Sequence, residues 1–581
     1  MMGLRSAFVE AYRTIRTGER YLGYSKIEVP QQSAFHPDVV GVEGDTAPGA
    51  LLRIALKATT IPSTIVFRGL NGADTFFKVL NQKAELYAQA QRKAVLEAGN
   101  DSSKLGELFQ NYLENPTREM HETAKKSALD NTFTSPSGPA VKLLMQLRSK
   151  IPILGYQILP FIQTPANIIG YALRSSPMAP MSGEFQRQIK AGGAERDKAI
   201  ARVATGTTMM ALGIDMALNG EITGSGPPVG SPMRAAWERK YRPFSFILPN
   251  GRTEQYNRFD PFGVWLGVSA EIVDMFTYQN ADPNHVKEFD EIFINLAFSL
   301  GSVMMNKTWM TGASDLIQAL SDPERYSQQF VNNTLTGYVP GVVKTAARID
   351  DPILRQTTNI WESFQSVLPG IKRKLSANVD YLGRESMQGS EFDDPTVRGL
   401  WNLLVPIESK PDRSQPIDNE LLRLQTGFKE PSHLISYDPK DGREGVIVSI
   451  RNEGEIISRY TYLTGQGRYG DATYPYVNMN LNEVLNEIVS GQAADGGRLT
   501  GERAEYHRIY QEASDGPNGG KKDIIDRLVG RYRAAARYQL FQEYPEFFNS
   551  EREIRLKRRE FLAEKQAEKP EAQAGEMPTI R

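Results

Sequence analysis

The chain has 581 residues, of which 40% are hydrophobic and 24% charged, and its 68 basic and 69 acidic side chains give a formal net charge of -1. This balance is typical of a globular protein of about two to four domains, and it excludes a chain-wide basic footprint for nucleic acid, although not local patches. The lack of cysteine excludes disulfides, thiolate zinc sites and cysteine nucleophiles, and it leaves the redox compartment open.

The chain offers no convincing targeting or membrane segment. Apolar and charged positions alternate over residues 1–21, so we expect no signal peptide. The most apolar stretch, Ile151–Leu173, contains Pro152, Pro160 and Pro165, which would break the hydrogen-bond ladder of a spanning helix. We therefore expect a buried, broken helix here in preference to a membrane span.

Helical periodicity dominates the first two thirds of the chain. Residues Phe67–Gly99 predict a long helix with one apolar face (Phe76, Phe77, Leu80, Leu86, Ala90) and one charged face (Lys78, Lys83, Glu85, Lys93). Further helices are predicted over Leu105–Leu113, Arg118–Leu129, Ala191–Leu218, Pro261–Phe276, Glu288–Met305 and Ala313–Leu320. Composition predicts loops or breaks at Pro30–Gly49, Ser135–Pro139 and Glu221–Pro232.

Two regions read as β-structure. Phe244–Leu248 and Arg252–Tyr256 flank Pro249-Asn250-Gly251, and Asn-Gly favours a hairpin with a type I′ turn. Pro406–Pro416 reads as a linker, after which Gly445–Ile450 and Glu455–Tyr460 are β-like.

Helical stripes return toward the end of the chain. Apolar residues recur at helical spacing in two sets (Leu481, Val484, Leu485, Ile488; Ile524, Leu528, Tyr532, Ala536, Leu540). Glu551–Lys565 reads as a charged, exposed helix, and residues from Ala567 onward as disordered.

The expected fold class is mainly α, with several helical segments and small β-hairpin or β-sheet inserts near 244–256 and 433–475. We expect five regions along the chain. They are an N-terminal helical region (1–140), an apolar helical core with the hairpin (141–405), a small α+β region (406–500), C-terminal helices (501–566) and a disordered tail (567–581).

Three glycine-rich or acidic motifs fail on spacing or context. Gly465-Gln-Gly467-Arg-Tyr-Gly470 matches G-x-G-x-x-G, but Pro475 argues against a following helix, so we expect a flexible loop. Gly516–Lys522 lacks the phosphate-loop spacing and reads as a solvated loop between helices. Asp438–Gly442 lacks the alternating oxygen ligands of a calcium loop and reads as a turn.

Candidate catalytic and metal-binding residues are equally weak. None of the five histidines lies three or four residues from another, so no helical metal pair exists (His36, His121, His285, His433, His507). Glu385-Ser386 is the one dipeptide reminiscent of a lytic transglycosylase's acid, but it lies in a polar stretch with no apolar pocket adjacent. Glu271 and Asp274 read as a solvated i, i+3 carboxylate pair. We therefore predict no catalytic, cofactor-binding or metal-binding residues, no cofactor and no enzymatic activity.

An ordered series of short blocks carries a family resemblance over Leu159 to about Asp380, and more weakly over Arg498–Pro545. The blocks include Leu159-Pro-Phe161-x-x-Thr164-Pro165-Ala-Asn167, Ser175-Ser-Pro177-x-Ala179-Pro180, Arg196-Asp197, Gly220–Pro228, Tyr241-Arg242-Pro243-x-Ser245 and Tyr256-Asn-Arg258-Phe-Asp260-Pro261-x-Gly263. Later blocks are Thr334-Leu-Thr-Gly337-Tyr-Val-Pro340, Thr358-Asn359, Leu368-Pro369-Gly370-Ile371, Tyr532–Arg537 and Glu543-Tyr-Pro545.

In this order the blocks resemble the internal virion or DNA-ejection proteins of tailed bacteriophages and the large polyvalent virion proteins related to them. Membership would imply a non-enzymatic protein of the capsid interior that leaves with the DNA and helps to form a conduit through the host envelope. Expected partners are copies of itself, other internal virion or portal proteins, and transiently the host envelope and genomic DNA, with no small-molecule substrate. The alternatives are another minor or portal-proximal virion protein, a peptidoglycan-cleaving or nucleotide-using enzyme, or a membrane-active binding module.

Overall fold

A computed structural model describes most of residues 2–567. The residues outside the description are 1, 20, 24–46, 100, 137–140, 143–144, 147–161, 229, 258, 260–261, 279–298, 300–302, 304–313, 317–318, 321–322, 338, 340, 358, 406, 429–431, 439–444, 452, 471–472, 517–518 and 568–581. Most of the proline-broken apolar stretch, nearly all of the helix predicted over Glu288–Met305, the turn after Asp438 and the predicted disordered tail therefore lie outside the described residues.

The chain is mainly helical with two small antiparallel sheets, which confirms the predicted fold class. It divides into two compact units built from interleaved pieces of sequence. Unit 1 comprises residues 1–225, 256–276 and 281–340, and unit 2 comprises residues 226–255, 277–280 and 341–581. Whether the five consecutive regions predicted above fold as separate domains stays a prediction.

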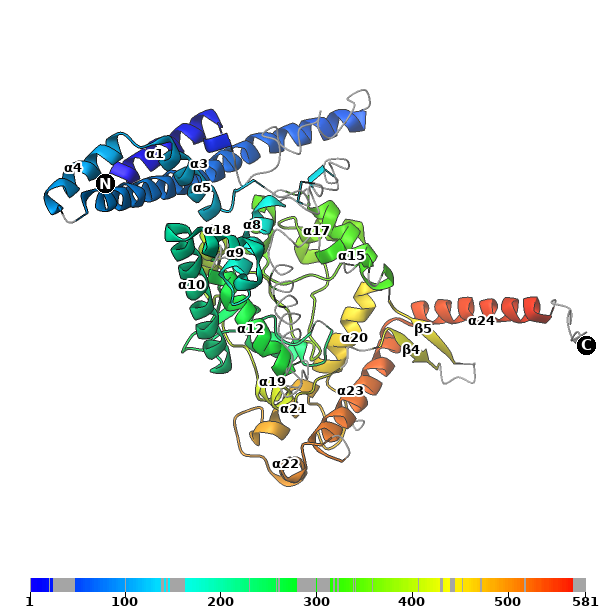
Figure 1. The fold of residues 1–581 in the computed structure, drawn as a ribbon. Coiled ribbons are helices and arrows are strands. Elements are labelled where there is room, and N and C mark those ends of the chain that lie inside the picture. The colour runs from blue at the N-terminus through cyan, green and yellow to red at the C-terminus, as the bar shows by residue number, and fades with distance from the viewer. Residues whose placement is uncertain are drawn as a thin grey trace, which may run out of the picture. The chain divides into compact units, whose positions relative to one another are not determined.

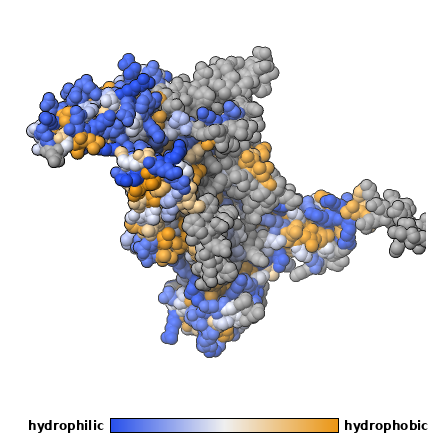
Figure 2. Space-filling model, in the orientation of Figure 1, coloured by the Kyte–Doolittle hydropathy of each residue, from blue (hydrophilic) through white to orange (hydrophobic). Residues whose placement is uncertain are grey.

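Unit 1 opens with a group of helices packed along one long helix (Figure 1). They are α1 (Met2–Thr17), η1 (Tyr21–Gly23), α3 (Ala47–Ala98), α4 (Ser102–Glu114) and α5 (Arg118–Asn131). The predicted helices in this region are confirmed, but α3 begins at Ala47, inside the stretch that was predicted to be loop. Figure 2 shows a mainly hydrophilic surface over these helices, interrupted by apolar patches.

One residue assigned to the charged face of the long helix is buried. Lys78 is 0% exposed, and its Nζ lies 2.7 Å from a carboxylate oxygen of the buried Asp74 one turn earlier. Its position on the charged face does not leave it in solvent, because α1 packs along α3. A buried ammonium group needs a partner of opposite charge, which Asp74 supplies.

The rest of unit 1 is also helical. It contains α8 (Gln163–Ser175), η2 (Ala179–Met181), α9 (Gly183–Ala191), α10 (Gly193–Leu218), α12 (Phe262–Tyr278, whose last two residues fall in unit 2) and α15 (Pro323–Thr336). The predicted buried helix near Pro261–Phe276 is confirmed, because every residue of α12 from Gly263 to Glu271 is buried. Gly206 of α10 allows a close approach, since a Cβ there would lie 2.0 Å from the carbonyl oxygen of Ser175.

The predicted solvated carboxylate pair on α12 is wrong for its first member. Glu271 is buried, and its two oxygens accept hydrogen bonds of 2.9 Å from the backbone N–H and the hydroxyl of Ser225. The Tyr256 hydroxyl donates a 2.7 Å bond to the carbonyl of Thr223. Glu271 therefore fixes the end of the loop that follows α10, because a buried carboxylate is stable only where donors replace its water.

Unit 2 combines the remaining helices with both sheets. Its helices are α11 (Arg234–Lys240), α16 (Gly341–Asp350), α17 (Ile360–Ser366), η4 (Lys372–Lys374), α18 (Pro395–Leu404), α19 (Pro416–Arg423), α20 (Gly454–Gln466), α21 (Leu481–Ser490), α22 (Gly501–Glu512), α23 (Lys521–Glu543) and α24 (Pro545–Ala567). Its strands are β1 (Ser245–Ile247), β2 (Thr253–Gln255), β3 (Ser409–Lys410), β4 (Leu434–Tyr437) and β5 (Val446–Ser449).

The core of unit 2 lies among α19, α20, α21 and α23. Both apolar stripes predicted near the end of the chain are buried in it, which confirms those helices. Figure 1 shows α20 and α23 side by side, and they share the largest helix–helix contact of this unit. Spacing of apolar residues at three and four positions places each stripe on one face, where burial of side chains stabilises the packing.

The first sheet confirms the predicted hairpin but not its turn. β1 and β2 pair antiparallel with Phe246 opposite Glu254. Leu248 pairs with Arg252, the N–H of Gly251 donates to the carbonyl of Leu248, and of Asn250 and Gly251 only Gly251 has a positive φ, of 77°. This is a three-residue loop with a type I turn and a glycine bulge, which suits Pro249 because proline presets the first turn position.

The predicted linker over Pro406–Pro416 is also wrong in part. Residues Ser409 and Lys410 form β3, which pairs antiparallel with β2 as the third strand of this sheet. Charge and proline content suggested a linker, whereas Ser409 is fully buried. Local composition could not reveal an edge strand of two residues, because its pairing partner lies far away in sequence.

The second sheet pairs β4 with β5, with Ile435 opposite Val448 on the buried face. The β prediction for Gly445–Ile450 is thus confirmed for β5. The prediction for Glu455–Tyr460 is wrong, since this segment lies in helix α20. Ile456, Tyr460 and Leu463 are buried at helical spacing, and this tertiary burial overrides the β preference of the Ile456-Ile457 pair.

Candidate functional site

Unit 2 contains a network of buried charges centred on Asp418, in the first turn of α19. The carboxylate of Asp418 accepts the backbone N–H of Gln415 at 2.8 Å, which completes a capping box at the start of the helix. Arg384 donates to both of its oxygens, each at 2.8 Å, and the Tyr381 hydroxyl donates to one of them. Burial and the nearby Asp418 carboxylate raise the pKa of Tyr381 well above its usual value.

A tight turn positions Arg384 for this contact. Asp380 accepts the backbone N–H groups of Leu382 and Arg384 with one oxygen and the Arg384 Nε, at 2.8 Å, with the other. Gly383 provides the positive φ of 70° that the turn requires. Burial by itself would lower the pKa of Arg384, but the hydrogen bonds to Asp418 and the charge of Asp380 raise it.

A second cluster joins the hairpin to the rest of unit 2. Arg242 donates to the Glu408 carboxylate and to the carbonyl of Gly389. Arg413 Nε lies 2.6 Å from Oε2 of the buried Glu391. Arg252, from the end of the hairpin loop, donates to the Ser409 hydroxyl at 2.8 Å. The three-stranded sheet is therefore held by ion pairs as well as by its short ladder.

A cavity of about 640 Å³ lies against both clusters and is lined by segments of α11, β3 and the 352–354, 378–391 and 410–413 stretches. Four cationic side chains line it, namely Arg239, Arg384, Lys410 and Arg413. Burial lowers the pKa of Lys410 to about 8, helped by Arg242 and Arg239 and opposed by Glu391 and Glu238. The Lys410 ammonium donates to the backbone carbonyl of Glu238.

This arrangement lacks the parts of an acid–base or nucleophilic centre. Asp380 and Asp418 each accept several hydrogen bonds from Arg384 and the backbone, so neither offers a free basic oxygen to a substrate. Glu385, the residue compared with a lytic transglycosylase's acid, is exposed at the rim of the cavity, so it lacks the apolar pocket in which such an acid lies. The chemistry available here is electrostatic binding.

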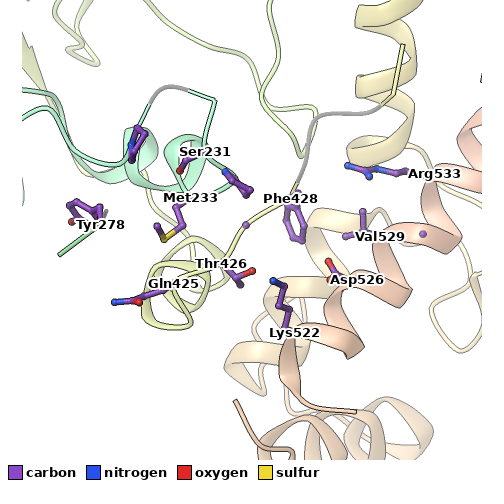
Figure 3. A pocket seen from close by; sticks show the side chains of 14 residues that line it. Ser231, Met233, Tyr278, Gln425, Thr426, Phe428, Lys522, Asp526, Val529 and Arg533 are labelled. Atoms are coloured by element: carbon purple, nitrogen blue, oxygen red, sulfur yellow. The ribbon is translucent and has the colours of Figure 1, made fainter. Parts of the chain in front are cut away.

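A second cavity, of about 580 Å³, lies elsewhere in unit 2 (Figure 3). Lys522, Asp526, Val529 and Arg533 project from successive turns of α23 toward Phe428. Met233 and Tyr278 form the opposite side, and a Cβ at Gly427 would lie 1.9 Å from the Pro232 carbonyl oxygen. Burial lowers the pKa of Arg533. Fewer charged side chains line this cavity than the first one.

The glycine-rich motifs of the sequence do not come together in one site. Gly465 and Gln466 belong to the last turn of α20, so the G-x-G-x-x-G stretch begins in a buried helix end and not in the flexible loop that was predicted. A Cβ at Gly465 would lie 1.9 Å from the carbonyl oxygen of Leu382, which explains the glycine by packing. The described residues from Gly516 to Gly520 lie between α22 and α23, as predicted, whereas Lys521 and Lys522 already belong to the first turn of α23.

The described residues contain no cluster of His, Asp and Glu side chains able to hold a metal ion. Of the histidines in this part of the chain, His507 is part-buried and its Nδ1 lies 2.7 Å from the Ile488 carbonyl oxygen, a structural contact. Among the same residues, no helix combines the length and the apolar character that crossing a membrane demands.

Sequence reasoning missed the charge network entirely. Its members are scattered over residues 239–418, and Lys410 and Arg413 were assigned to a linker. The single sequence clue was the Tyr241-Arg242-Pro243 block, in which Arg242 turns out to be a network member. Comparison with known proteins adds no further guide, since no family model, curated protein or solved structure matches the chain.

Proposed function

We propose that this chain is a non-enzymatic structural component of a tailed-phage virion, packaged inside the capsid and ejected with the DNA to help form a conduit through the host envelope. The proposal rests on the ordered blocks that resemble internal virion proteins. A structural role for those blocks is supported by the hydrogen bonds and close packing contacts that their residues make in the fold.

Residues of the blocks pack and bridge segments. Asn167 donates to the carbonyls of Phe133 and Ser135 at 3.0 and 2.9 Å, which ties α8 to the end of α5. A Cβ at Gly263 would lie 2.6 Å from the Tyr256 carbonyl oxygen, so the Tyr256–Gly263 block needs its glycine for close packing.

The same holds in unit 2. Arg242 bridges the hairpin to Glu408, and the Tyr532 hydroxyl of the late block donates to the Met479 carbonyl at 2.9 Å. The N–H of Gly370 donates to the Asp350 carboxylate at 2.9 Å. Residues of the blocks therefore maintain the architecture of the fold. This agrees with a protein whose role is to assemble with other proteins.

The direct test compares the protein content of particles before and after ejection. Virions of the phage that encodes this chain would be triggered with receptor in vitro, separated from released material and quantified by mass spectrometry against the major capsid protein. We expect this chain in intact virions and its loss from emptied ones, while the portal protein is retained as the internal control. Retention in emptied particles would instead indicate a portal-proximal structural protein, and absence from virions would refute both.

The enzymatic alternative has its own test. Purified protein would be applied to a peptidoglycan zymogram beside a Glu385→Gln variant. We expect no clearing by either protein. Clearing that is lost in the variant would overturn the non-enzymatic part of the proposal.

A further inference from the structure

The N-terminal helices of unit 1 leave a row of apolar side chains uncovered on α3. The row repeats at alternating steps of three and four residues and carries no charge (Leu70, Ala73, Phe77, Leu80, Ala84, Tyr87). All of its members are exposed except Leu80, which is half-buried. Steps of three and four residues place side chains along one narrow seam, the pattern by which one helix packs against another.

Helix α1 adds a second apolar row beside the first. It runs along α3 in the opposite direction, because a Cβ at Gly3 would lie 3.6 Å from that of Lys83, whereas a Cβ at Gly72 would meet Ile15 (Figure 1). Small side chains of α1 are buried, and large apolar ones on the neighbouring face stay exposed (Leu4, Phe8, Tyr12, Ile15).

Ring contacts join the two rows into one surface. The ring of Phe8 on α1 lies 4.9 Å from that of Phe76, which in turn lies 5.3 Å from that of Phe77 in the row on α3. The two rows together are called the α1/α3 apolar face below.

The size of the α1/α3 apolar face suits a stable protein interface. Phe8, Tyr12, Phe77 and Tyr87 are each between 55% and 66% exposed. A fully covered aromatic side chain buries about 150–250 Å², so these four leave roughly 500 Å² in water. A standard interface buries about 800 Å² on each partner, and the exposed aliphatic side chains of both rows contribute toward the remainder. A contiguous apolar patch of this size marks an interaction site.

The row on α3 has the same order of side-chain sizes in both directions. Outward from its centre between residues 78 and 79, it reads large, small, large on either side (Phe77, Ala73, Leu70; Leu80, Ala84, Tyr87). An antiparallel copy of α3 would therefore bring Ala73 opposite Ala84 and Phe77 opposite Leu80. Complementarity of a surface to itself is what a two-fold interface between identical chains requires.

We propose that the chain forms a two-fold dimer through the α1/α3 apolar face, with α3 of one copy antiparallel to α3 of the other. The alanine positions allow the two helices to approach closely, and the larger side chains on either side then interdigitate. The interface is a property of unit 1 and does not depend on the proposed virion function.

Sedimentation equilibrium of the full chain over a range of concentrations tests the dimer. We expect twice the mass of one chain, and dissociation on dilution. Phe77→Glu should weaken dimerisation by at least about a hundredfold, because a two-fold dimer loses the apolar burial of this side chain twice.

Leu96→Glu is the matched control. Leu96 is 83% exposed on the same helix and lies outside both rows, so its substitution should leave dimerisation unchanged. Circular dichroism of both variants establishes that the helices are formed before their affinities are compared.

Disulfide crosslinking tests the antiparallel arrangement, and the chain has no cysteine of its own to interfere. Oxidation of an equal mixture of Ala73→Cys and Ala84→Cys chains should link one chain of each kind, because these positions lie opposite each other in the proposed dimer. Either variant alone should remain unlinked. Antiparallel pairing keeps identical positions about 16 Å apart along the helix axis, which is beyond the reach of a disulfide.

Three outcomes would overturn the proposal. The first is a chain that stays monomeric at every concentration, or a Phe77→Glu variant that dimerises as tightly as Leu96→Glu. The second is self-linking of the Ala73→Cys chain, which would show that the helices pair in parallel. The third is a monomer that floats with vesicles of phosphatidylglycerol and phosphatidylethanolamine and loses this flotation in Phe77→Glu, because a lipid surface would then cover the face in place of a second copy.

Discussion

Arg384 donates hydrogen bonds of 2.8 Å to both oxygens of Asp418, whose side chain is 0% exposed. The two residues lie 34 positions apart and join the turn at Asp380–Arg384 to the first turn of α19. A bidentate pair at this depth fixes both segments in one geometry, because any other arrangement would leave a charge unpaired away from water.

Asp418→Asn should therefore lower the free energy of unfolding by about 1.5–3 kcal/mol, because the buried Arg384 keeps Asp380 but loses its charged hydrogen bonds to Asp418. Urea unfolding of the full chain measures the change. Arg508→Gln serves as the control, because Arg508 pairs with Glu505 and Glu512 on the exposed side of α22. A loss for Asp418→Asn no greater than for Arg508→Gln would contradict the structural role of the pair.

The glycine-rich stretch that begins in the last turn of α20 offers two variants with opposite expectations. Gly465→Ala would place a Cβ 1.9 Å from the Leu382 carbonyl oxygen, whereas Gly470 has no heavy atom within 4 Å of its Cβ position. We expect Gly465→Ala to cost about 1–3 kcal/mol through overpacking and Gly470→Ala to be nearly neutral. Thermal unfolding distinguishes them, and equal midpoints would mean that Gly465 is not constrained by packing.

The Lys78–Asp74 pair in unit 1 tests whether a buried ion pair stabilises this fold. Lys78→Met alone should cost about 3 kcal/mol because Asp74 keeps a buried charge. The double variant Lys78→Met/Asp74→Leu should recover most of this loss, since well-packed apolar side chains often replace such pairs without cost. Urea unfolding of the two variants measures their free energies of unfolding. A double variant that is less stable than the single one would show that the ion pair itself stabilises the packing of α1 on α3.

Lys410 should give the stability of the protein a specific dependence on pH. Its pKa is about 8 in the fold against the ordinary lysine value of 10.5, so between these two values the unfolded chain binds more protons. The contribution of Lys410 to the free energy of unfolding must then rise as pH rises from about 8 toward 10. Over this range the ammonium, which lies among Arg239, Arg242, Glu238 and Glu391, loses its charge.

The measurement is the free energy of unfolding of wild type minus that of Lys410→Met at pH 7.5, 8.5 and 9.5. We expect this difference to increase with pH by on the order of 1 kcal/mol over that range. Buried tyrosines such as Tyr532, whose pKa is raised to about 12, act in both proteins and cancel. A difference that is flat or falls with pH would show that Lys410 keeps an ordinary pKa.

Much of the secondary structure could be predicted from the sequence, because helical periodicity is a local property. The stripe at Ile524, Leu528, Tyr532, Ala536 and Leu540 specified α23 and its buried face. The hairpin followed from Pro249-Asn250-Gly251, although its turn type required knowing that Leu248 pairs with Arg252. Glu455–Tyr460 was misread because a pair of isoleucines prefers strands, and only packing on α23 selects a helix.

What the sequence by itself determined is the mainly helical class and the absence of cysteine chemistry, since both follow from composition and short-range spacing. What only the tertiary structure decided is which charges meet. Lys78 was placed on the charged face of its helix and is buried, and Lys410 was placed in a linker and lines a cavity. The sequence around a charged side chain does not reveal its ion-pair partner, because a pair such as Arg384–Asp418 forms only when folding brings distant segments together.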